Sequence, residues 1–304
     1  MTGRLHPSRD LTVVVPTRDR PDRLAACLDA IERLDPPPRE VVVVDSGSSG
    51  PGATAPAHGR ATVLRCERPG ASRARNAGWR AASGSLVGFV DDDVRVAPSW
   101  AAALCAPFAD ERVAFVTGAV VGGEALAGAA AGDRPVAVTD DVRAGPIDRG
   151  ALGNVGASAS LAVRRSALEA VGGFDELLGA GARFRSAEDI DLFDRLLVGG
   201  IGWHAPEAVA HHDQWRSRRE LLALELAYGS GYGVRLAKVL RADPARGRAL
   251  AQYEARRLVG DVAHDLRGRY AFGVVSRVAW AAAALQGWAS GRRVAVRDGH
   301  LHLP

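Results

Sequence analysis

Three consecutive aspartates, Asp91, Asp92 and Asp93, follow the apolar run at residues 86–90. An apolar run of this length between turn residues predicts a buried strand. Three carboxylates at the end of a strand cannot be packed into a core, because a buried, unpaired charge is too unfavourable. Clusters of carboxylate oxygens suit Mg²⁺ or Mn²⁺, with water and substrate phosphates as further ligands. The cluster therefore indicates a metal site, and the alternative is a solvated acidic turn.

A second acidic pair, Glu188 and Asp189, opens a predicted helix at residues 189–198, whose apolar side chains share one face. A carboxylate at a helix start is kept ionised and fixed in direction by free backbone N–H groups. Such a carboxylate can take the proton from an attacking hydroxyl group. The alternative is an ordinary charge pair at the N-terminus of a helix.

The elements that position these carboxylates can be predicted from hydrophobic periodicity. We expect strands at residues 11–15, 40–45, 61–64 and 85–90, and helices at residues 22–34 and 71–82. Strands that alternate with helices predict an α/β fold with a parallel sheet. Functional loops then lie at the carboxyl ends of the strands. Thr17, Asp45 and the three aspartates are all expected at this edge, which predicts a nucleotide-sized site.

The second half of the chain is less regular. We expect a helix at residues 98–108, a strand at 112–121, a long surface loop at 124–149, a sheet segment at 152–163 and a helix at 164–171. From Arg216 the chain is predicted to be helical to about Ala289. The predicted division is a catalytic domain at residues 1–215 and a helical region at 216–304. The first of these divides further into two halves, at about 11–121 and 122–215.

Composition excludes some classes of protein. The 304 residues are 47% hydrophobic and 24% charged, as in ordinary globular proteins. The net charge of +4, from 39 basic and 35 acidic residues, is too small and diffuse to predict nucleic-acid binding. Three cysteines without metal-type spacing are expected to be reduced thiols.

Targeting signals are weak. The first ten residues lack the apolar core of a signal peptide, and the apolar stretch 270–288 is interrupted by Arg277 and Gln286. We therefore expect a cytoplasmic protein, or one that is peripheral at the inner face of the membrane. The basic helices after Arg216 could contact a membrane or form a homodimer, and the alternative is simple packing against the catalytic domain.

Six motifs in a fixed order resemble the family 2 glycosyltransferases of the GT-A fold. They are VVVPTRDR (13–20), EVVVVDSGSS (40–49), RPGASRARNAG (68–78), FVDDD (89–93), RRSALEAVGGFDE (164–176) and SAEDIDLFDRL (186–196). Each motif alone is weak, but together they span residues 11–215. The resemblance implies a Rossmann-like, mostly parallel central sheet flanked by helices, here with a C-terminal helical extension.

The resemblance also implies a nucleotide-sugar and metal half at about 11–121, which holds the donor site, and an acceptor half at about 122–215. Asp93 would be the direct metal ligand, while Asp91 and Asp92 would complete the site through water and through the ribose hydroxyls. His211 or His212, which the sequence does not separate, would be a third metal ligand. The groups expected on the nucleotide are Pro16 and Thr17, Asp45 and Arg75. Relatives often have a second Asp where this chain has Ser46, which weakens any assignment of the base.

The implied reaction is an inverting transfer from a nucleoside-diphosphate sugar to a hydroxyl acceptor. Asp189 would be the general base and Glu188 would orient the acceptor. Mn²⁺ or Mg²⁺ would assist. Uridine is the base that the resemblance favours, with guanosine and deoxythymidine as the alternatives. The acceptor would be a glycan, a lipid-linked intermediate or a small molecule.

Three alternatives belong to other classes. A sugar nucleotidyltransferase would need a glycine-rich phosphate loop after the first strand, where this chain has Pro16 and Thr17. A haloacid-dehalogenase-type phosphatase would use Asp91 and Asp93, but Arg95 stands where Thr or Val is typical. A non-catalytic nucleotide-sugar-binding scaffold would not need the complete set of carboxylates.

Overall fold

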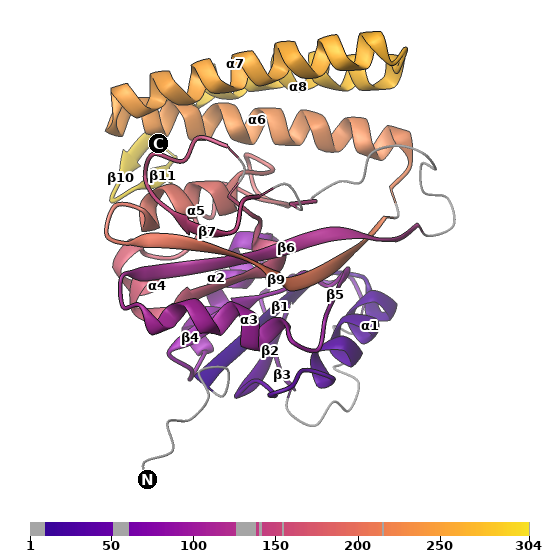
Figure 1. Ribbon diagram of the computed structural model, residues 1–304, viewed down its shortest axis with the longest axis vertical. Coiled ribbons are helices and arrows are strands. Elements are labelled where there is room, and N and C mark those ends of the chain that lie inside the picture. Colours follow the sequence, from indigo (N-terminus) through magenta and orange to yellow (C-terminus); the bar gives the residue numbers. More distant parts are fainter. Residues whose placement is uncertain are drawn as a thin grey trace.

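The computed structural model describes residues 10–50, 61–125, 138–139, 142–153, 155–214 and 216–303. Its described part contains one nine-stranded sheet with helices on both faces, and three long helices form a further layer over one side (Figure 1). The expected α/β fold with a C-terminal helical extension is confirmed.

The first four strands form the parallel part of the sheet. They are β1 (Leu11–Thr17), β2 (Glu40–Asp45), β3 (Ala61–Arg65) and β4 (Leu86–Phe89), in the order β3-β2-β1-β4. The strand order reverses at β1, because β2 and β4 pair with its opposite edges. In such sheets the ligand crevice lies at the carboxyl ends of the strands beside the reversal. Thr17 pairs with Asp45 there, and the three aspartates follow β4.

The remaining strands make the sheet mixed. They are β5 (Val94–Val96), β6 (Val113–Ala125), β7 (Gly145–Ile147), β8 (Leu161–Arg164) and β9 (Ile201–Gln214). β8 is antiparallel to both β4 and β6, whereas β6 and β9 are parallel. β5 and β7 are both antiparallel to β9. The sequence analysis missed β5 and β9, as well as β7, which lies in the expected loop at 124–149. Of the expected segment 152–163, only the last residues belong to a strand.

Helices cover both faces of this sheet because its strands are apolar on both sides. α1 (Pro21–Glu32) and α3 (Trp100–Cys105), which continues as the short 3₁₀ turn Ala106–Ala109, pack on one face. α2 (Ala71–Ala81), α4 (Arg165–Val171) and α5 (Glu188–Leu196) pack on the other. Alternate residues of one strand supply the two cores: Val13 and Val15 face α1, and Val14 faces α2.

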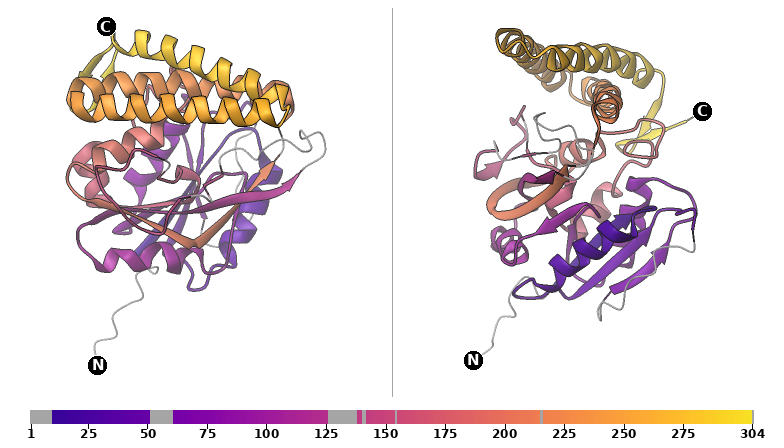
Figure 2. Two further views of the ribbon diagram at one scale, coloured as in Figure 1. Left: turned by 45° about the horizontal axis from the view of Figure 1, so that its top comes forward. Right: turned by 90° about the vertical axis from the view of Figure 1, so that its right-hand side faces the viewer.

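The C-terminal layer consists of α6 (Arg218–Ala242), α7 (Pro244–Arg267) and α8 (Ala271–Gly291), and Figure 2 shows it as a separate tier over the α5 side of the sheet. A capping box between Ser217 and Glu220 starts α6. Gly229 and Gly233 let α8 approach closely, because a Cβ on either would lie within 2.2 Å of a backbone carbonyl oxygen of α8. A hairpin of β10 (Ala295–Arg297) and β11 (His300–His302), which the sequence analysis missed, follows α8.

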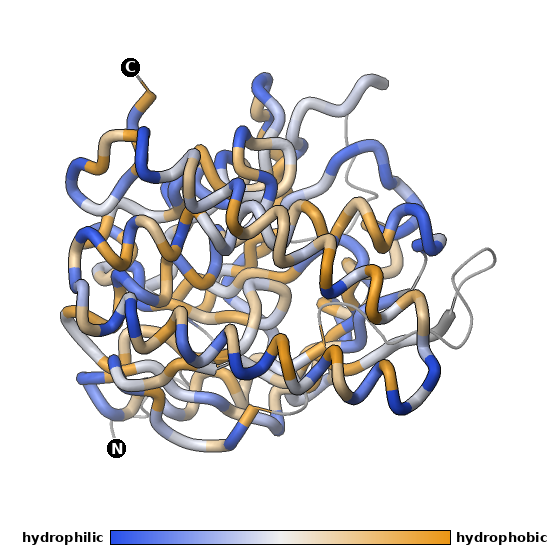
Figure 3. The backbone as a smooth tube through the Cα atoms, turned by 90° about the horizontal axis from the view of Figure 1, so that it is seen from above, coloured by the Kyte–Doolittle hydropathy of each residue, from blue (hydrophilic) through white to orange (hydrophobic). Residues whose placement is uncertain are grey.

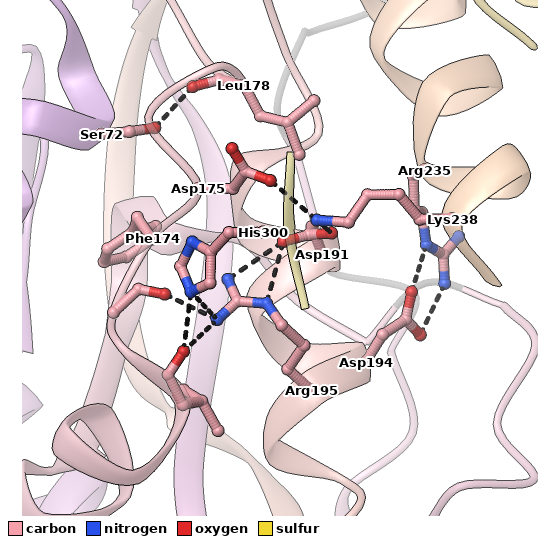
Figure 4. Close-up of polar contacts among 12 residues, drawn as sticks. Ser72, Phe174, Asp175, Leu178, Asp191, Asp194, Arg195, Arg235, Lys238 and His300 are labelled. Carbon is pink, nitrogen blue, oxygen red and sulfur yellow. Dashed lines mark hydrogen bonds and ion pairs between the residues drawn. The ribbon is translucent and has the colours of Figure 1, made fainter. Parts of the chain in front are cut away.

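The helical layer and the catalytic part share a buried charge network (Figure 4). Lys238 of α6 forms ion pairs with Asp175 and with Asp191 of α5. Asp194, also on α5, pairs with Arg235 and with Arg246 of α7. These contacts cross the predicted boundary at residue 215. α5 therefore packs on the sheet with one side and forms ion pairs with the C-terminal helices on the other. No helix in the described part of the chain is long and apolar enough to cross a membrane.

Candidate active site

A pocket of about 340 Å³ opens at the carboxyl edge of the parallel strands. Its walls come from the ends of β1 and β2, the start of α2, the acidic segment after β4, the segment that leads into α5, the end of β9 and the first half of α6. They include the expected residues Pro16, Thr17, Arg75, Asp91, Asp92, Asp93, Glu188 and His212. The fold therefore brings most of the residues expected from the sequence into one cavity.

The aspartate cluster is held by a network of donors. The hydroxyl group of Thr17 donates to Asp92 Oδ2 at 2.8 Å, and Arg20 Nη1 lies 3.0 Å from Asp92 Oδ1 and 3.4 Å from Asp93 Oδ2. Burial raises the pKa of Asp92, while the nearby Arg20 offsets part of that shift. Arg20, which directly precedes the proline that starts α1, was not singled out in the sequence analysis.

Arg75 connects the aspartate cluster to the acidic helix start. This guanidinium is only 3% exposed, and its Nη2 donates to Asp91 Oδ1 at 2.7 Å while its Nη1 donates to Glu188 Oε1 at 2.9 Å. Its Nε is buried without a hydrogen-bond partner. The sequence assigned Arg75 to the nucleotide, whereas its contacts in this structure are with the two carboxylates.

The start of α5 fixes Glu188 and Asp189. Ala187 caps the helix in the left-handed region, with φ of 70°, where glycine is favoured. The Asp189 carboxylate accepts hydrogen bonds from the backbone N–H groups of Ile190 at 2.8 Å and Ser158 at 3.3 Å. Burial raises the pKa of both acids, and for Glu188 the neighbouring Asp189 adds to the shift. Glu188 lines the pocket, whereas Asp189 lies beside it against Ser158.

The two histidines are separated by the alternation of β9. His212 is 3% exposed, and its Nε2 lies 3.6 Å from Asp93 Oδ1. His211 is exposed and lines a different hollow with Arg95, Gly122 and Gly123. Within the described ranges, no group of three or more His, Cys, Asp or Glu side chains is arranged to hold a metal ion by itself.

Asp45 lies behind the pocket rather than on its wall. It is 1% exposed, its Oδ1 accepts from the backbone N–H of Ser48 at 2.9 Å, and its Oδ2 pairs with Arg65 Nη1 at 2.9 Å. Both oxygens of the carboxylate are therefore engaged within the protein. Arg65 also pairs with Glu67 at 3.0 Å, and the sequence analysis had not singled it out.

The first half of α6 closes the pocket over Glu188. Leu224 and Tyr228 line this wall together with Arg216, which precedes the helix. Burial raises the pKa of the Tyr228 hydroxyl well above its usual value. The sequence did not predict this wall, because α6 comes after the last of the six motifs in the chain and contains none of them. Most of the surface loop expected at residues 124–149 lies outside the described residues, namely residues 126–137 and 140–141.

Comparisons with known proteins find relatives among the glycosyltransferases. The model of glycosyl transferase family 2 matches residues 12–132, and that of glycosyl transferase family 21 matches residues 74–197. A pre-mycofactocin glycosyltransferase from Mycobacterium tuberculosis is 31% identical over 234 residues, which are 73% of this chain and 46% of that protein. The chain thus spans about half the length of the curated relatives it matches.

Solved structures show the same fold at low identity. The mannosyltransferase PcManGT from Pyrobaculum calidifontis, in complex with GDP-Man and Mn²⁺, has a TM-score of 0.63 and 22% identity, covering 91% of this chain and 86% of that chain. S. aureus TarS with UDP-GlcNAc has a TM-score of 0.53 and 16% identity, covering 97% of this chain and 96% of that chain. The fold is that of the GT-A glycosyltransferases. Within that class, the chain belongs to glycosyltransferase family 2.

Proposed function

We propose that this chain is an inverting glycosyltransferase that moves a sugar from a nucleoside-diphosphate sugar to a hydroxyl acceptor. The observation that carries the proposal is the pair of Arg75 contacts, to Asp91 at 2.7 Å and to Glu188 at 2.9 Å. These two contacts connect the proposed donor end of the pocket, at Asp91, with its proposed acceptor end, at Glu188. A sugar that occupied the space beside Arg75 would have a diphosphate-binding cluster on one side and a proton acceptor on the other.

The donor end suits a divalent cation. Asp93 and His212 are buried, lie 3.6 Å apart and line the pocket. A carboxylate and an imidazole form a donor set that Mn²⁺ accepts, and substrate phosphates commonly supply further ligands. We therefore assign metal binding to Asp93 and His212, with Asp91 and Asp92 in supporting positions. The cation would neutralise charge that develops on the leaving diphosphate.

Asp189 is the proposed general base. Its carboxylate is oriented by two backbone N–H groups and forms no ion pair with a described residue. Burial raises its pKa, which makes it a better proton acceptor near neutral pH than an ordinary aspartate. Glu188, which is already paired with Arg75, would orient the acceptor.

The donor nucleotide and the acceptor are proposed as classes. Uridine stays our first candidate, and the GDP-Man bound to PcManGT adds guanosine as the second. The wall formed by Leu224 and Tyr228 would contact the acceptor. Glycans, lipid-linked intermediates and small molecules remain the acceptor classes, and a pre-mycofactocin-type acceptor belongs to the last.

The test begins with donor binding. Thermal unfolding is measured with UDP, GDP, dTDP and CDP, each with Mn²⁺, Mg²⁺ or EDTA. A ligand at 100 times its Kd stabilises the folded protein by about 2.7 kcal/mol. We expect one nucleotide to raise the Tm only when a divalent cation is present, and Asp93→Asn to abolish this shift.

Catalysis is then tested with the matching nucleotide sugar and a panel of hydroxyl acceptors. Asp189→Asn should keep the nucleotide-dependent Tm shift and lose transfer. Full transfer by this variant would exclude Asp189 as the base. A protein that binds no nucleotide and transfers no sugar would contradict the proposed function as a whole.

A further inference from the structure

The outer side of α7 and α8 is an exposed apolar surface that no described residue covers. Five of the nine exposed large hydrophobic side chains in the described part of the chain belong to these two helices, and their exposed fractions lie between 53% and 70%. They are Val259, Leu266, Val275, Val278 and Leu285. Figure 3 views the molecule from the side of this layer, and apolar and polar turns alternate along the helices. We call this surface the outer helical face.

The exposed residues of α8 form a continuous stripe. They recur every three or four residues, which places them on one side of a helix. They are Ala271, Val275, Val278, Ala282, Leu285 and Ala289, with Gln286 at the margin. The opposite side of α8 is already used, because Gly287 and Gly291 pack against the backbone of α6. The stripe is therefore not needed to hold the helical layer together.

The charges around this stripe have one sign. The exposed residues of α7 and α8 include Arg248, Arg256 and Arg267 but no Asp or Glu. Of the acidic residues of α7, Asp265 is buried, while Glu254 and Asp261 are partly buried and both pair with Arg257. The outer helical face thus has a continuous apolar stripe on α8, and the exposed side chains of the neighbouring α7 include both apolar residues and arginines.

We propose that the outer helical face lies on an anionic lipid bilayer, with α7 and α8 parallel to the membrane surface. Exposed apolar side chains can enter the boundary between head groups and acyl chains, while flanking arginines contact lipid phosphates. No described helix can cross the membrane, so the contact is interfacial.

The distribution of charge favours lipid over a second copy of this chain. A two-fold symmetric dimer would bring the same patch of both subunits together. The arginine borders of the two copies would then meet without an acidic residue on either exposed face to pair with them. A bilayer that contains acidic lipids supplies the missing negative charge.

The test is co-sedimentation of the full chain with vesicles. One set contains phosphatidylcholine and phosphatidylglycerol in a roughly two-to-one mixture, and the other contains phosphatidylcholine alone. We expect binding to the mixed vesicles, with weaker binding at high salt because screening reduces the attraction of arginine to lipid phosphate. None of these readouts depends on sugar transfer, so the result is independent of the proposed function.

Two variants and a matched control examine the face itself. Val278→Asp and Leu285→Asp should each lower the partition coefficient by about tenfold or more. Val198→Asp changes a side chain that is 68% exposed but follows α5 in the catalytic part, and it should bind as the wild type does. Circular dichroism checks that each protein is folded.

Three results would overturn the proposal. They are the absence of binding to the mixed vesicles, equal binding by the wild type and the two face variants, and a wild-type dimer in light scattering that Val278→Asp converts to a monomer. The last result would assign the face to a second copy of the chain.

Discussion

Arg75 and Glu188 lie 113 positions apart in the chain and form an ion pair of 2.9 Å inside the pocket. Because the same guanidinium also contacts Asp91, it connects the acidic segment after β4 to the start of α5. The distance between the two acidic groups of the site is thus set by one side chain, which the sequence alone could not reveal.

Replacing this cation should destabilise the protein strongly. Arg75→Gln leaves Glu188 and Asp91 without their partner, and breaking a buried pair from one side costs about 3 kcal/mol or more. The matched control is Arg73→Gln on the same helix, since Arg73 pairs with Glu176 near the surface and exposed pairs contribute about 1 kcal/mol at most. Urea unfolding at neutral pH measures both. Equal stability of the two variants would contradict the bridging role of Arg75.

The rate of sugar transfer should fall on acidification at a higher pH than an ordinary aspartate would require. Asp189 accepts a proton only when it is ionised, and burial raises its pKa. An unperturbed aspartate titrates near pH 3.9, about the lower limit of most assays. We therefore expect kcat/KM to be constant at neutral pH and to drop as the pH falls through the raised pKa. Unfolding measured at each pH separates this effect from denaturation. A rate that falls only at the pH where an ordinary aspartate titrates would argue against Asp189.

Lys238 should be essential for stability. Lys238→Met removes the cation that Asp175 and Asp191 share, and the expected loss is about 3–5 kcal/mol because both carboxylates stay buried. Arg219→Met, at an exposed position of the same helix, is the control and should change the free energy of unfolding little. A Lys238→Met protein as stable as the control would show that the network does not hold α5.

The ion pairs of Lys238 also affect how the stability of the protein depends on pH. Burial alone would raise the pKa of Asp191, but Lys238 and Arg195 outweigh it and hold the pKa below its usual value. A lowered pKa in the folded state stabilises the protein at pH values above the unfolded pKa of about 3.9. This stabilisation is lost as the pH falls through the folded pKa. Wild-type stability should therefore decline more steeply below about pH 4 than that of Lys238→Met, as denaturant titrations at several pH values can measure.

Ala187→Gly should stabilise the protein. Ala187 has φ of 70°, and the left-handed region costs a residue with a Cβ about 1–2 kcal/mol. Part of this gain is offset by the greater chain entropy of glycine, so we expect a net increase of about 0.5–1 kcal/mol in the free energy of unfolding. Ala187→Val should have the opposite effect, and a ranking with valine above glycine would contradict the observed backbone conformation.

The sequence was most informative where local pattern and topology agree. The apolar strands β1, β2 and β4 are buried on both sides, so each was recognisable as a short apolar run that ends at a turn. Because functional loops lie at the carboxyl ends of parallel strands, Thr17 and Asp91–Asp93 were expected close together. In the structure they line one pocket. β9 was missed because polar residues such as Glu207 and His211 interrupt its apolar pattern.

Partners from distant segments could not be predicted. Nothing in the local sequence of Asp45 indicates that Arg65 engages its carboxylate, or that Arg20 contacts Asp92. Such contacts depend on which strands and helices become neighbours, and this is decided by the packing of the whole sheet. The position of α6 in the pocket wall also depends on the packing of distant segments, so it could not be predicted either.

Lys238 is the only lysine in the chain, and its side chain is 7% exposed between two aspartates. An amine-reactive acylating reagent can modify it only when α6 separates from α5, because the amine is otherwise enclosed and charged. The extent of its acylation therefore reports how often the helical layer opens. Because no second lysine competes for the reagent, peptide mapping by mass spectrometry can follow this motion at one side chain and separate it from acylation of the N-terminal amine.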